Sequence, residues 1–411
     1  MKVLLLTQWY PPEPAKLISE LAESLQLLGH SVEVLTGFPN YPRGVLYPGY
    51  RLRLMQREMI EGIRVIRVPL YPDHSPSAIK RILNYLSFSL SAAVVGLFAT
   101  QRPDVILVYG SPYTAAISAI VHRWFRRVPF VFYVVDLWPE SLEGTGMLQN
   151  RTANALVRFF ARQIYRRAAR VVAVSPGFGL RILDEGVPAE KVAVIPTWVD
   201  VDHYAPRPRD EAIRDRFGIH GAFTILFAGN IGPAQGIETV IDAAVLLRSL
   251  PEIEIVIAGD GISLPAVQEK ARDLGADNVR FLGALPPSDM PALFGSVDAL
   301  LVHLKRNPMW EISIPHKIFA YMASGKPIVA AVAGDAAEIV ASAHAGVICD
   351  PGDAQALADA VRALALTSEK ERTALGESGR SAAVTQFNRG RIVGLLGGVL
   401  DDAVRAATAG K

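Results

Sequence analysis

The sequence is poor in cysteine and carries almost no net charge. Its 411 residues include one cysteine, Cys349, and the formal net charge is +2. A single cysteine excludes an internal disulfide, a cysteine-based metal cluster and a Cys-x-x-Cys redox site, and it fits a reducing compartment. The small net charge neither favours nor excludes an anionic partner, so only local charged patches are informative. No nucleic-acid recognition motif appears, and we expect no nucleic-acid partner.

The sequence also lacks a recognisable targeting segment and a metal-ligand pattern. The apolar run at its start, MKVLLLTQWYPP, is short and no small-residue cleavage site follows it, so it does not resemble a signal peptide. His303 and His316 lie near the stretches that we expect to bind an anion, but no histidine or carboxylate spacing suggests a metal site. We therefore expect no bound metal.

Strand and helix patterns alternate along almost the whole chain. Half of the residues are hydrophobic and 20% are charged, which is a globular composition. One series of buried strands starts with KVLLLT and a second with FTILFAGN. Two such series predict an α/β protein with two doubly wound, Rossmann-like domains. A polar, proline-bearing stretch separates them, so we expect domains at 1–200 and 201–389, with a final helix, 390–411, that packs on either domain.

The stretch FAGNIGPAQGIETVIDAA, residues 227–244, has the pattern of a buried strand, a glycine turn and a helix. This geometry presents backbone N–H groups to a phosphate. We expect Gly229, Asn230, Gly232 and Gln235 to face such a ligand. The stretch contains no cation, however, so the charge of a phosphate has to be neutralised from elsewhere.

A second stretch, EISIPHKIFAYMASGKPIVAA, supplies a candidate for that cation. Pro315 suits the first turn of a helix, which would leave the N–H groups of Ser313 and Ile314 unpaired and place Lys317 about one turn in. Amides, the helix dipole and an ammonium group together make an anion site. The alternative is an ordinary loop with a surface lysine. Lys305, which follows the strand DALLVHL, and Arg306 are a reserve source of charge.

Two more stretches of the first domain place polar side chains after a strand. In FVFYVVDLWPESLEGTG, Asp136 ends a strand and Glu140 follows four residues later. A carboxylate at this place can orient or deprotonate an acceptor hydroxyl, or support positive charge on a departing sugar. The alternative is that Asp136 caps the next helix and Glu140 stabilises its first turn. Gly110 and Ser111, in VYGSPYTAA, lie at the same expected edge.

Three stretches of the first domain suggest a membrane surface. No charged residue occurs between Arg81 and Arg102, a length close to the roughly 20 residues of a membrane span, but Asn84 and three serines favour a buried or half-docked helix. HRWFRRVPF at 122–130 and RFFARQIYRRAAR at 158–170 mix arginines with aromatic residues. Basic helices of this kind can lie in an anionic bilayer interface. The alternative is a helix whose apolar stripe packs on the sheet while its arginines are solvated.

The order of the motifs is similar to that of GT-B glycosyltransferases, in the large retaining family that uses nucleotide-sugar donors. The resemblance covers nearly the whole chain and is carried by eight motifs: MKVLLLTQWYPPE, LGHSVEVLT, VVAVSPGF, VIPTWVDVDHY, FAGNIGPAQGIETVIDAA, IVIAGDG, VRFLGAL and YMASGKPIV. GNIGPAQG, DLWPES and P-x-K-x-F-x-YMASGKP together resemble a narrower branch, the bacterial L-fucosamine-type transferases that build surface polysaccharides on a lipid carrier. The resemblance implies two Rossmann-like domains facing across a cleft, and metal-independent transfer with no cofactor beyond the donor.

The resemblance also implies roles for particular residues. The second domain would bind the donor through the residues already named at 229–235, through Gly259, Gly261 and Leu282, and through Ser313, Ile314, Lys317 and Glu338. The first domain would hold the acceptor through Glu13, Lys16, Gly110 and Ser111. Asp136, Glu140 and Lys317 would serve catalysis.

The sequence departs from this family at the expected donor site. Family members commonly carry arginine and lysine where Asn230 and Gln235 stand here. The family's Glu-x7-Glu pair falls at Ile312 and Ala320, with Glu311 one place away, so the resemblance does not extend to ribose recognition by the second glutamate. We expect Lys317, with the nearby amides, to replace the missing charge.

The resulting expectation is an enzyme that moves a sugar from a nucleoside diphosphate sugar to a polyprenyl-diphosphate-linked acceptor. The donor would be a UDP-linked N-acetylated or 6-deoxy sugar. The enzyme would work in the cytoplasm, on the inner face of the cytoplasmic membrane. Two alternatives stay open, namely a UDP-sugar epimerase of the same architecture and a non-catalytic nucleotide-sugar-binding protein.

Overall fold

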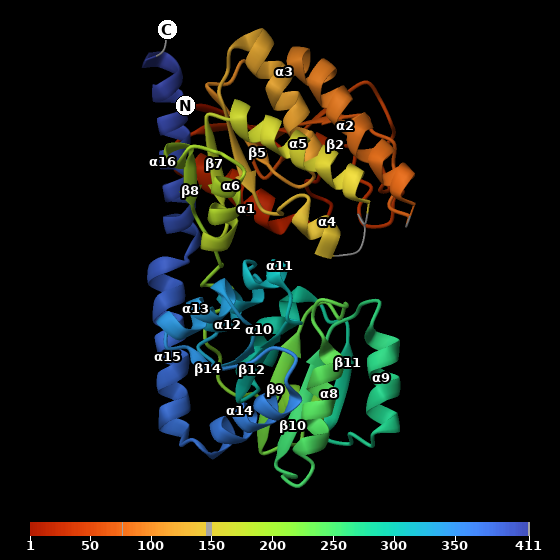
Figure 1. The fold of residues 1–411 in the computed structure, drawn as a ribbon, viewed down its shortest axis with the longest axis vertical. Coiled ribbons are helices and arrows are strands. Elements are labelled where there is room, and N and C mark those ends of the chain that lie inside the picture. Colours follow the sequence, from red (N-terminus) through yellow and green to blue (C-terminus); the bar gives the residue numbers. More distant parts are fainter. Residues whose placement is uncertain (76, 145–149, 410–411) are drawn as a thin grey trace. The chain divides into compact units, whose positions relative to one another are not determined.

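The computed structural model describes residues 1–75, 77–144 and 150–409. The chain forms two compact units (Figure 1). Unit 1 comprises Met1–Pro196 and Ile392–Lys411, and unit 2 comprises Thr197–Arg391. The boundary lies four residues before the one expected from the sequence, since 200 − 196 = 4. The final helix, α16 (Arg389–Ala409), belongs to unit 1 from Ile392 onward.

Unit 1 contains an eight-stranded sheet in the order β3-β4-β2-β1-β5-β6-β7-β8. Its strands are β1 (Lys2–Leu6), β2 (Ser31–Gly37), β3 (Gln56–Ile60), β4 (Ile63–Val68), β5 (Val105–Tyr109), β6 (Phe130–Val134), β7 (Arg170–Ala173) and β8 (Val192–Val194). Only β3, at the edge, pairs antiparallel within the described sheet. Strand order reverses between β1 and β5, where Val3 pairs with Val105. Ligands of such sheets bind at this reversal, beyond the carboxyl ends of the strands.

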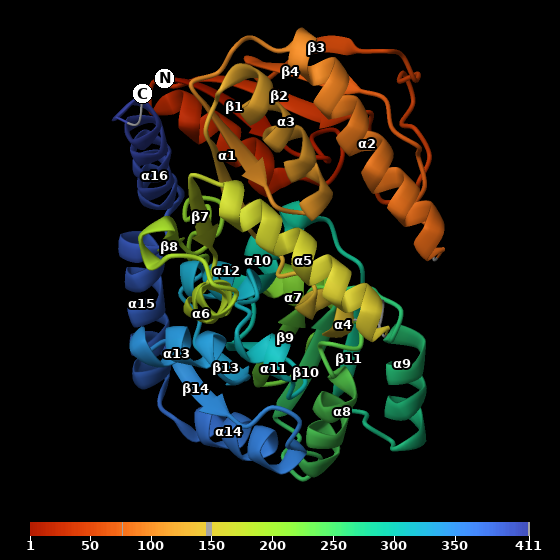
Figure 2. The same cartoon turned by 45° about the horizontal axis from the view of Figure 1, so that its top comes forward.

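The helices of unit 1 cover the two faces of that sheet. Besides α16, they are α1 (Lys16–Leu27), α2 (Ala78–Ala99), α3 (Ala116–Arg126), α4 (Glu140–Gly144), α5 (Arg151–Arg167) and α6 (Pro176–Asp184), with 3-10 turns η1 (Tyr113–Ala115) and η2 (Ala189–Lys191). Figure 2 shows α2, α3 and α5 side by side, and α2 packs on both α3 and β4. The edge where β1 and β5 end is therefore flanked by α1 and by the α2–α3–α5 layer.

Unit 2 contains a six-stranded, fully parallel sheet in the order β11-β10-β9-β12-β13-β14. Its strands are β9 (Phe223–Ala228), β10 (Ile253–Ala258), β11 (Val279–Gly283), β12 (Ala299–His303), β13 (Ile328–Ala331) and β14 (Gly346–Cys349). Strand order reverses between β9 and β12, where Leu300 pairs with Leu226. The loops after these two strands therefore meet at the expected ligand edge of unit 2.

Unit 2 has a hydrophobic core on each face of its sheet. Its helices are α7 (Glu211–Phe217), α8 (Ile237–Leu246), α9 (Leu264–Asp273), α10 (Met290–Gly295), α11 (Pro308–Glu311), α12 (Lys317–Ala323), α13 (Asp335–Ser342), α14 (Ala354–Leu366) and α15 (Glu369–Gln386), with the 3-10 turn η3 (Pro287–Asp289). Because side chains alternate along a strand, Leu226 packs with α10, α12, α13 and α15, whereas Ile225 packs with α8, α9 and α14 (Figure 1). The two doubly wound, Rossmann-like folds expected from the sequence are present.

The charge-free stretch after Arg81 forms most of α2. By length and composition this helix is apolar enough to cross a membrane, and 33% of its most apolar window is buried. Its inner face carries Asn84, whose side chain accepts a hydrogen bond from Gln8 (2.5 Å) and donates one to the carbonyl of Tyr71 (2.7 Å). The helix is therefore docked on unit 1 by one face, which agrees with the half-docked interpretation of the sequence.

Candidate donor and acceptor sites

The glycine loop after β9 packs directly against the Gly-Asp-Gly turn after β10. Gly229 has a φ of +133° and Gly259 one of +148°. A Cβ on Gly259 would lie 1.8 Å from the carbonyl oxygen of Gly229, so only glycine fits at this position. The N–H of Ile231 also donates to the carbonyl of Asp260 (2.8 Å). The two stretches expected to bind the donor thus form one continuous backbone surface.

Lys317 lies against this same surface. Its Nζ is 3.8 Å from the centroid of the Phe227 ring and 2.9 Å from the position that a Cβ on Gly229 would occupy. The hydroxyl of Tyr321, one helical turn later, accepts a hydrogen bond from the N–H of Ala228 (3.0 Å) and contacts the Ala228 carbonyl (3.2 Å). Because residues i and i+4 share a helix face, this anchor aligns Lys317 with the loop.

Burial lowers the pKa of Lys317 to about 7. The sequence pattern placed this lysine about one turn inside a helix, whereas in the structure it is the first residue of α12. Within the described residues, its ammonium group lies over an aromatic ring and forms no ion pair with a carboxylate. A cation that is largely desolvated and has no partner carboxylate is well placed to bind an incoming anion.

The polar side chains of the loop bond to one another and to its backbone. The Gln235 Oε1 accepts hydrogen bonds from the N–H of Gly232 (3.0 Å) and from the Asn230 Nδ2 (3.2 Å). The Gly232 amide is therefore paired within the loop. Gln235 has to rotate before this amide can donate to a phosphate, while Asn230 is exposed to solvent.

Lys305 and Arg306 take different directions after β12. The Lys305 Cγ lies 2.7 Å from the position of a Cβ on Gly236, and its Nζ is 3.9 Å from a carboxylate oxygen of Glu238. Arg306 instead forms an ion pair with Asp350 (3.1 Å). Of the two reserve cations, only Lys305 lies beside the glycine loop.

Four other residues expected at the donor site are distributed around this edge. The N–H of Ser313 is used within its own turn, since it donates to the carbonyl of Trp310 (3.3 Å), and its hydroxyl donates to that of Met309 (2.8 Å). Ile314 and Leu282 are half-buried and pack against the core of unit 2. Glu338 is exposed on α13. Ser313 therefore offers no unpaired amide, which differs from the sequence-based expectation.

A cavity of about 580 Å³ lies at the reversal point of unit 1. It is lined by residues that follow β1, β5 and β6, together with Tyr41 and His74: Trp9, Pro14, Ala15, Lys16, Leu17, Ile18, Tyr41, His74, Tyr109, Ser111, Val135 and Asp136. Lys16, Ser111 and Asp136, three of the residues predicted from the sequence, thus share one cavity. Lys16 also forms an ion pair with Glu20 (3.6 Å) on α1.

The two carboxylates of the DLWPES motif have different surroundings. An oxygen of Asp136 accepts a hydrogen bond from the indole N–H of Trp138 (3.0 Å), which orients the carboxylate at the cavity wall. Glu140 forms an ion pair with Arg158 (3.3 Å) on α5, and it does not line the cavity. Burial raises the pKa of Glu140. Asp136 is therefore the better candidate for contact with an acceptor, and Glu140 has a structural partner.

Glu13 and Gly110, both predicted to bind the acceptor, lie outside the cavity wall. Glu13 is 3% exposed and its carboxylate accepts hydrogen bonds from the N–H groups of Tyr10 (3.1 Å), Asn40 (2.8 Å) and Tyr41 (2.8 Å). Burial raises its pKa to about 7. The N–H of Gly110 donates to the carbonyl of Tyr133 (2.8 Å). Both residues therefore hold loops around the cavity in place.

Sequence reasoning missed several residues that shape these sites. Tyr321 fixes Lys317, and Trp138 orients Asp136. The only indication in the sequence was their spacing, since Tyr321 stands four residues after Lys317 and Trp138 two after Asp136. His74 reaches the cavity from a distant loop, and no local pattern marks it. Within residues 1–75, 77–144 and 150–409, no group of three or more His, Cys, Asp or Glu side chains is arranged to hold a metal ion.

Both halves of the chain match known protein families. Residues 14–198 match the family described as "Glycosyl transferase 4-like domain", and residues 209–382 match "Glycosyl transferases group 1". The Escherichia coli (strain K12) protein "Putative colanic acid biosynthesis glycosyl transferase WcaI" is 29% identical over 338 residues, which cover 79% of this chain and 82% of that protein. "Probable glycosyltransferase WbjE" from Pseudomonas aeruginosa is 26% identical and covers 63% of this chain and 65% of its own.

Solved structures of similar fold include Anabaena Alr3699/HepE in complex with UDP and glucose. The two structures superpose with a TM-score of 0.72 at 19% sequence identity, and the match covers 98% of this chain and 99% of the HepE chain. A relative from Mycolicibacterium smegmatis, a "GDP-mannose-dependent alpha-(1-6)-phosphatidylinositol monomannoside mannosyltransferase", is 29% identical over 51% of this chain and 57% of its own. At 19% identity, the likeness to the HepE structure shows the fold alone.

Proposed function

The chain belongs to the GT-B glycosyltransferases of family 4, and from this premise we propose that it transfers a sugar from a nucleoside diphosphate sugar to a lipid-linked acceptor in the synthesis of a bacterial surface polysaccharide. The observation that carries the proposal is the position of Lys317, whose ammonium lies beside Gly229 at the carboxyl end of β9. Similarity to WcaI supports the polysaccharide context.

In unit 2, the donor diphosphate would lie over the loop after β9. Lys317 would supply the positive charge that the loop itself lacks, and Asn230 and Gln235 would donate hydrogen bonds. Lys305, beside the same loop, adds charge from β12. A cation held in place before the reaction stabilises the charge that develops on the departing diphosphate. Lys317 thus combines donor binding with leaving-group stabilisation. No metal ion or additional cofactor takes part in this proposal.

In unit 1, the acceptor hydroxyl would enter the cavity that Asp136 lines. The carboxylate, held by Trp138, would orient this hydroxyl and accept its proton as the new glycosidic bond forms. Because the residues named here include no nucleophile that points to a covalent sugar intermediate, we propose attack on the same face as the departing diphosphate, which retains the anomeric configuration. The sugar is proposed to be an N-acetylated or 6-deoxy sugar carried by UDP.

A cytoplasmic location at the inner face of the membrane is part of the proposal. Along α2, a stripe of exposed apolar side chains faces away from the sheet, and it includes Leu83, Leu90, Val94 and Phe98. Trp124 and Phe125 on the neighbouring α3 are 66% and 73% exposed. Such a surface suits the boundary of a bilayer, where the carrier lipid resides.

The basic helix α5 contributes less charge to that surface than its sequence suggested. Arg158 pairs with Glu140 and Glu185, and Arg162 pairs with Glu185, so two carboxylates balance these two positive charges within unit 1. Apolar contact is therefore the main contribution to membrane binding in this proposal.

The test is sugar transfer from a panel of donors with and without a membrane lipid extract. The panel contains UDP-linked N-acetylated and 6-deoxy sugars, UDP-glucose and GDP-mannose, and products are identified by mass spectrometry. The proposal predicts a sugar-bearing lipid product with at least one UDP-sugar. Conversion of a UDP-sugar without lipid would indicate an epimerase instead. Donor binding without any product would indicate a non-catalytic protein.

A further inference from the structure

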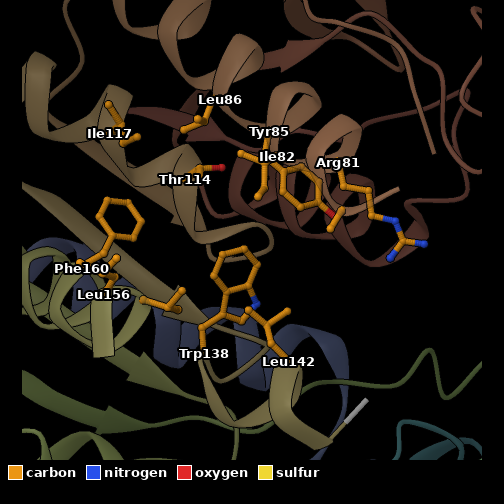
Figure 3. A pocket seen from close by; sticks show the side chains of 12 residues that line it. Arg81, Ile82, Tyr85, Leu86, Thr114, Ile117, Trp138, Leu142, Leu156 and Phe160 are labelled. Atoms are coloured by element: carbon orange, nitrogen blue, oxygen red, sulfur yellow. The ribbon is translucent and has the colours of Figure 1, made fainter. Parts of the chain in front are cut away.

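A second hollow in unit 1 lies on the outer side of Trp138 and Tyr85 (Figure 3). It has a volume of about 360 Å³ and is formed by α2, η1, α3, α4 and α5. Most of the lining side chains are apolar: Ile82, Leu86, Ile117, Leu142, Leu156 and Phe160. We call this hollow the α2–α5 groove. None of the function described so far uses it.

The groove exposes apolar side chains that a soluble domain would normally cover. Ile82 is 54% exposed and Leu156 is 65% exposed, on opposite sides of the groove. Exposed apolar surface of this kind marks a site for an apolar ligand or partner.

The groove and the acceptor cavity share a wall. Trp138 lines the groove, while its indole N–H donates to Asp136, which lines the cavity. Tyr85 also lines the groove, and its ring centroid is 6.4 Å from that of Trp138 and 6.4 Å from that of Trp9, which lines the cavity. A molecule that passes around these aromatic rings would therefore contact both hollows.

Positive charge lies where the two hollows meet. Arg81 stands at one end of the groove, and its guanidinium group points away from the apolar side chains (Figure 3). The Arg81 Nε donates to the carbonyl of Ser75 (3.0 Å), which fixes the side chain. Burial raises the pKa of Tyr85 and lowers that of His74, and the positive charge of Arg81 acts on both groups. His74 belongs to the cavity wall, so an anion beside Arg81 would lie between groove and cavity.

This order of surfaces matches a molecule with a hydrocarbon chain, an anionic link and a polar head. We infer that the α2–α5 groove binds the first part of the isoprenoid chain of the acceptor lipid, with the diphosphate of that lipid beside Arg81 and its sugar in the cavity of Asp136. The inference rests on the proposed function and adds to it the part of unit 1 that recognises the lipid.

A direct binding experiment tests the groove without requiring sugar transfer. Farnesyl diphosphate, kept below its aggregation concentration, is titrated into the full chain in the absence of donor and followed by calorimetry. Two variants place a charge in the groove, Leu86→Asp on α2 and Leu156→Asp on α5. Two matched controls, Phe159→Asp on α5 and Leu180→Asp on α6, place the same charge outside the groove, at side chains that are 61% and 64% exposed.

The expected result is that both groove variants bind farnesyl diphosphate about tenfold or more weakly, because the ligand would have to desolvate a carboxylate. Both controls should bind as the wild type does. Absence of binding by the wild type, or unchanged binding by the groove variants, would overturn the inference. Equal weakening in all four variants would also overturn it, since this would indicate a general apolar or membrane-facing surface. Thermal unfolding verifies that each variant is folded.

The charge at the junction is tested separately. Arg81→Ala should reduce the affinity for farnesyl diphosphate to that for farnesol, and it should leave farnesol binding unchanged. Equal losses for both ligands would contradict the placement of the diphosphate.

The groove and the proposed function fail in different ways. Binding of farnesyl diphosphate without sugar transfer to any lipid would contradict the transferase proposal and leave the groove standing. Transfer to a lipid without farnesyl diphosphate binding would do the opposite.

Discussion

At the scale of single residues, a lysine from another element lies beside a glycine loop that has no cation of its own. Lys317 comes from a helix that follows β12 and yet lies beside Gly229, after β9. Its position depends on Tyr321, whose hydroxyl joins α12 to Ala228. The sequence allowed the lysine to be chosen as a candidate, because it stands near the start of a helix. Its contact with the glycine loop depends on tertiary packing, which no local pattern contains.

The lowered pKa of Lys317 predicts a pH-dependent donor affinity. The lysine is charged below its pKa of about 7 and becomes neutral as the pH rises through that value, so the affinity should be highest below pH 7 and fall above it. UDP-glucose is a suitable probe, because its diphosphate keeps the same charge between about pH 6 and pH 9. Calorimetric titrations across this range measure the effect. An affinity that stays constant over the range would contradict it.

Glu13 should contribute to stability and not to acceptor binding. Glu13→Ala leaves three buried backbone N–H groups without their acceptor, and each unpaired group costs about 1–3 kcal/mol. We expect the free energy of unfolding to fall by about 3 kcal/mol or more, measured by denaturant unfolding. The exposed Glu190→Ala serves as the control. A stable Glu13→Ala variant with an increased acceptor KM would show that Glu13 binds the acceptor.

At the scale of elements, α2 combines two surfaces that its composition does not separate. The sequence showed a long helix without charge, and its inner and outer faces became distinct only through packing. Asn84, Phe88 and Ala92 lie on the buried face, whereas Leu90 and Val94 lie on the exposed one. The sequence reveals the helical period of α2. Which face contacts the sheet depends on distant residues such as Gln8, which lies 76 positions away from its partner Asn84.

The exposed face of α2 should be required for binding to membranes. Replacing Leu90, Val94 and Phe98 together by aspartate removes three exposed apolar side chains and adds negative charge. Binding to vesicles of phosphatidylethanolamine and phosphatidylglycerol, measured by cosedimentation, should fall about tenfold or more.

A matched triple variant in unit 2 controls for general effects of added charge. It replaces Ile262, Leu274 and Leu366, which are 85%, 40% and 80% exposed, by aspartate. This variant should bind vesicles as the wild type does. Equal losses in the two triple variants would mean that α2 has no special role at the membrane.

The strand and helix order could be predicted from the sequence, because buried parallel strands are short apolar runs with glycine or polar turns. The loops were less predictable. The amide of Ser313 was expected to be unpaired, yet it donates to the carbonyl of Trp310, and the amide of Gly232 donates to Gln235. Such local pairing depends on side-chain rotamers and turn geometry. The Glu13 carboxylate likewise accepts hydrogen bonds from nearby Tyr10 and from the distant neighbours Asn40 and Tyr41, and no local pattern shows the latter contact.

At the scale of the whole molecule, the two units carry different parts of the proposed reaction. Unit 2 holds the glycine loop and Lys317, and unit 1 holds the cavity of Asp136. Substitutions in the two units should therefore have separable effects. Changes in unit 2 should alter donor affinity, whereas changes in unit 1 should alter transfer.

Asp136→Asn tests this division of roles. Asparagine keeps the size of the side chain and an oxygen that can accept the hydrogen bond of Trp138, but it removes the base. We expect kcat for transfer to fall about a hundredfold or more, while the dissociation constant for UDP stays within about twofold of that of the wild type. Asp184→Asn, at an exposed position of unit 1, is the control. A large change in UDP affinity with unchanged kcat would contradict the assignment of Asp136 to the acceptor.

The most direct test of the central claim is the affinity of the full chain for UDP in the wild type, in Lys317→Ala and in Lys326→Ala. The titrations are made at about pH 6.5, because this lies below the pKa of Lys317, which is about 7. Lys326 is a second half-buried lysine of unit 2, located after α12. If Lys317 neutralises the donor diphosphate, its removal should weaken UDP binding tenfold or more, because a charge-assisted hydrogen bond contributes about 1.5–3 kcal/mol, while Lys326→Ala should bind normally. Unchanged UDP binding in Lys317→Ala would contradict the claim.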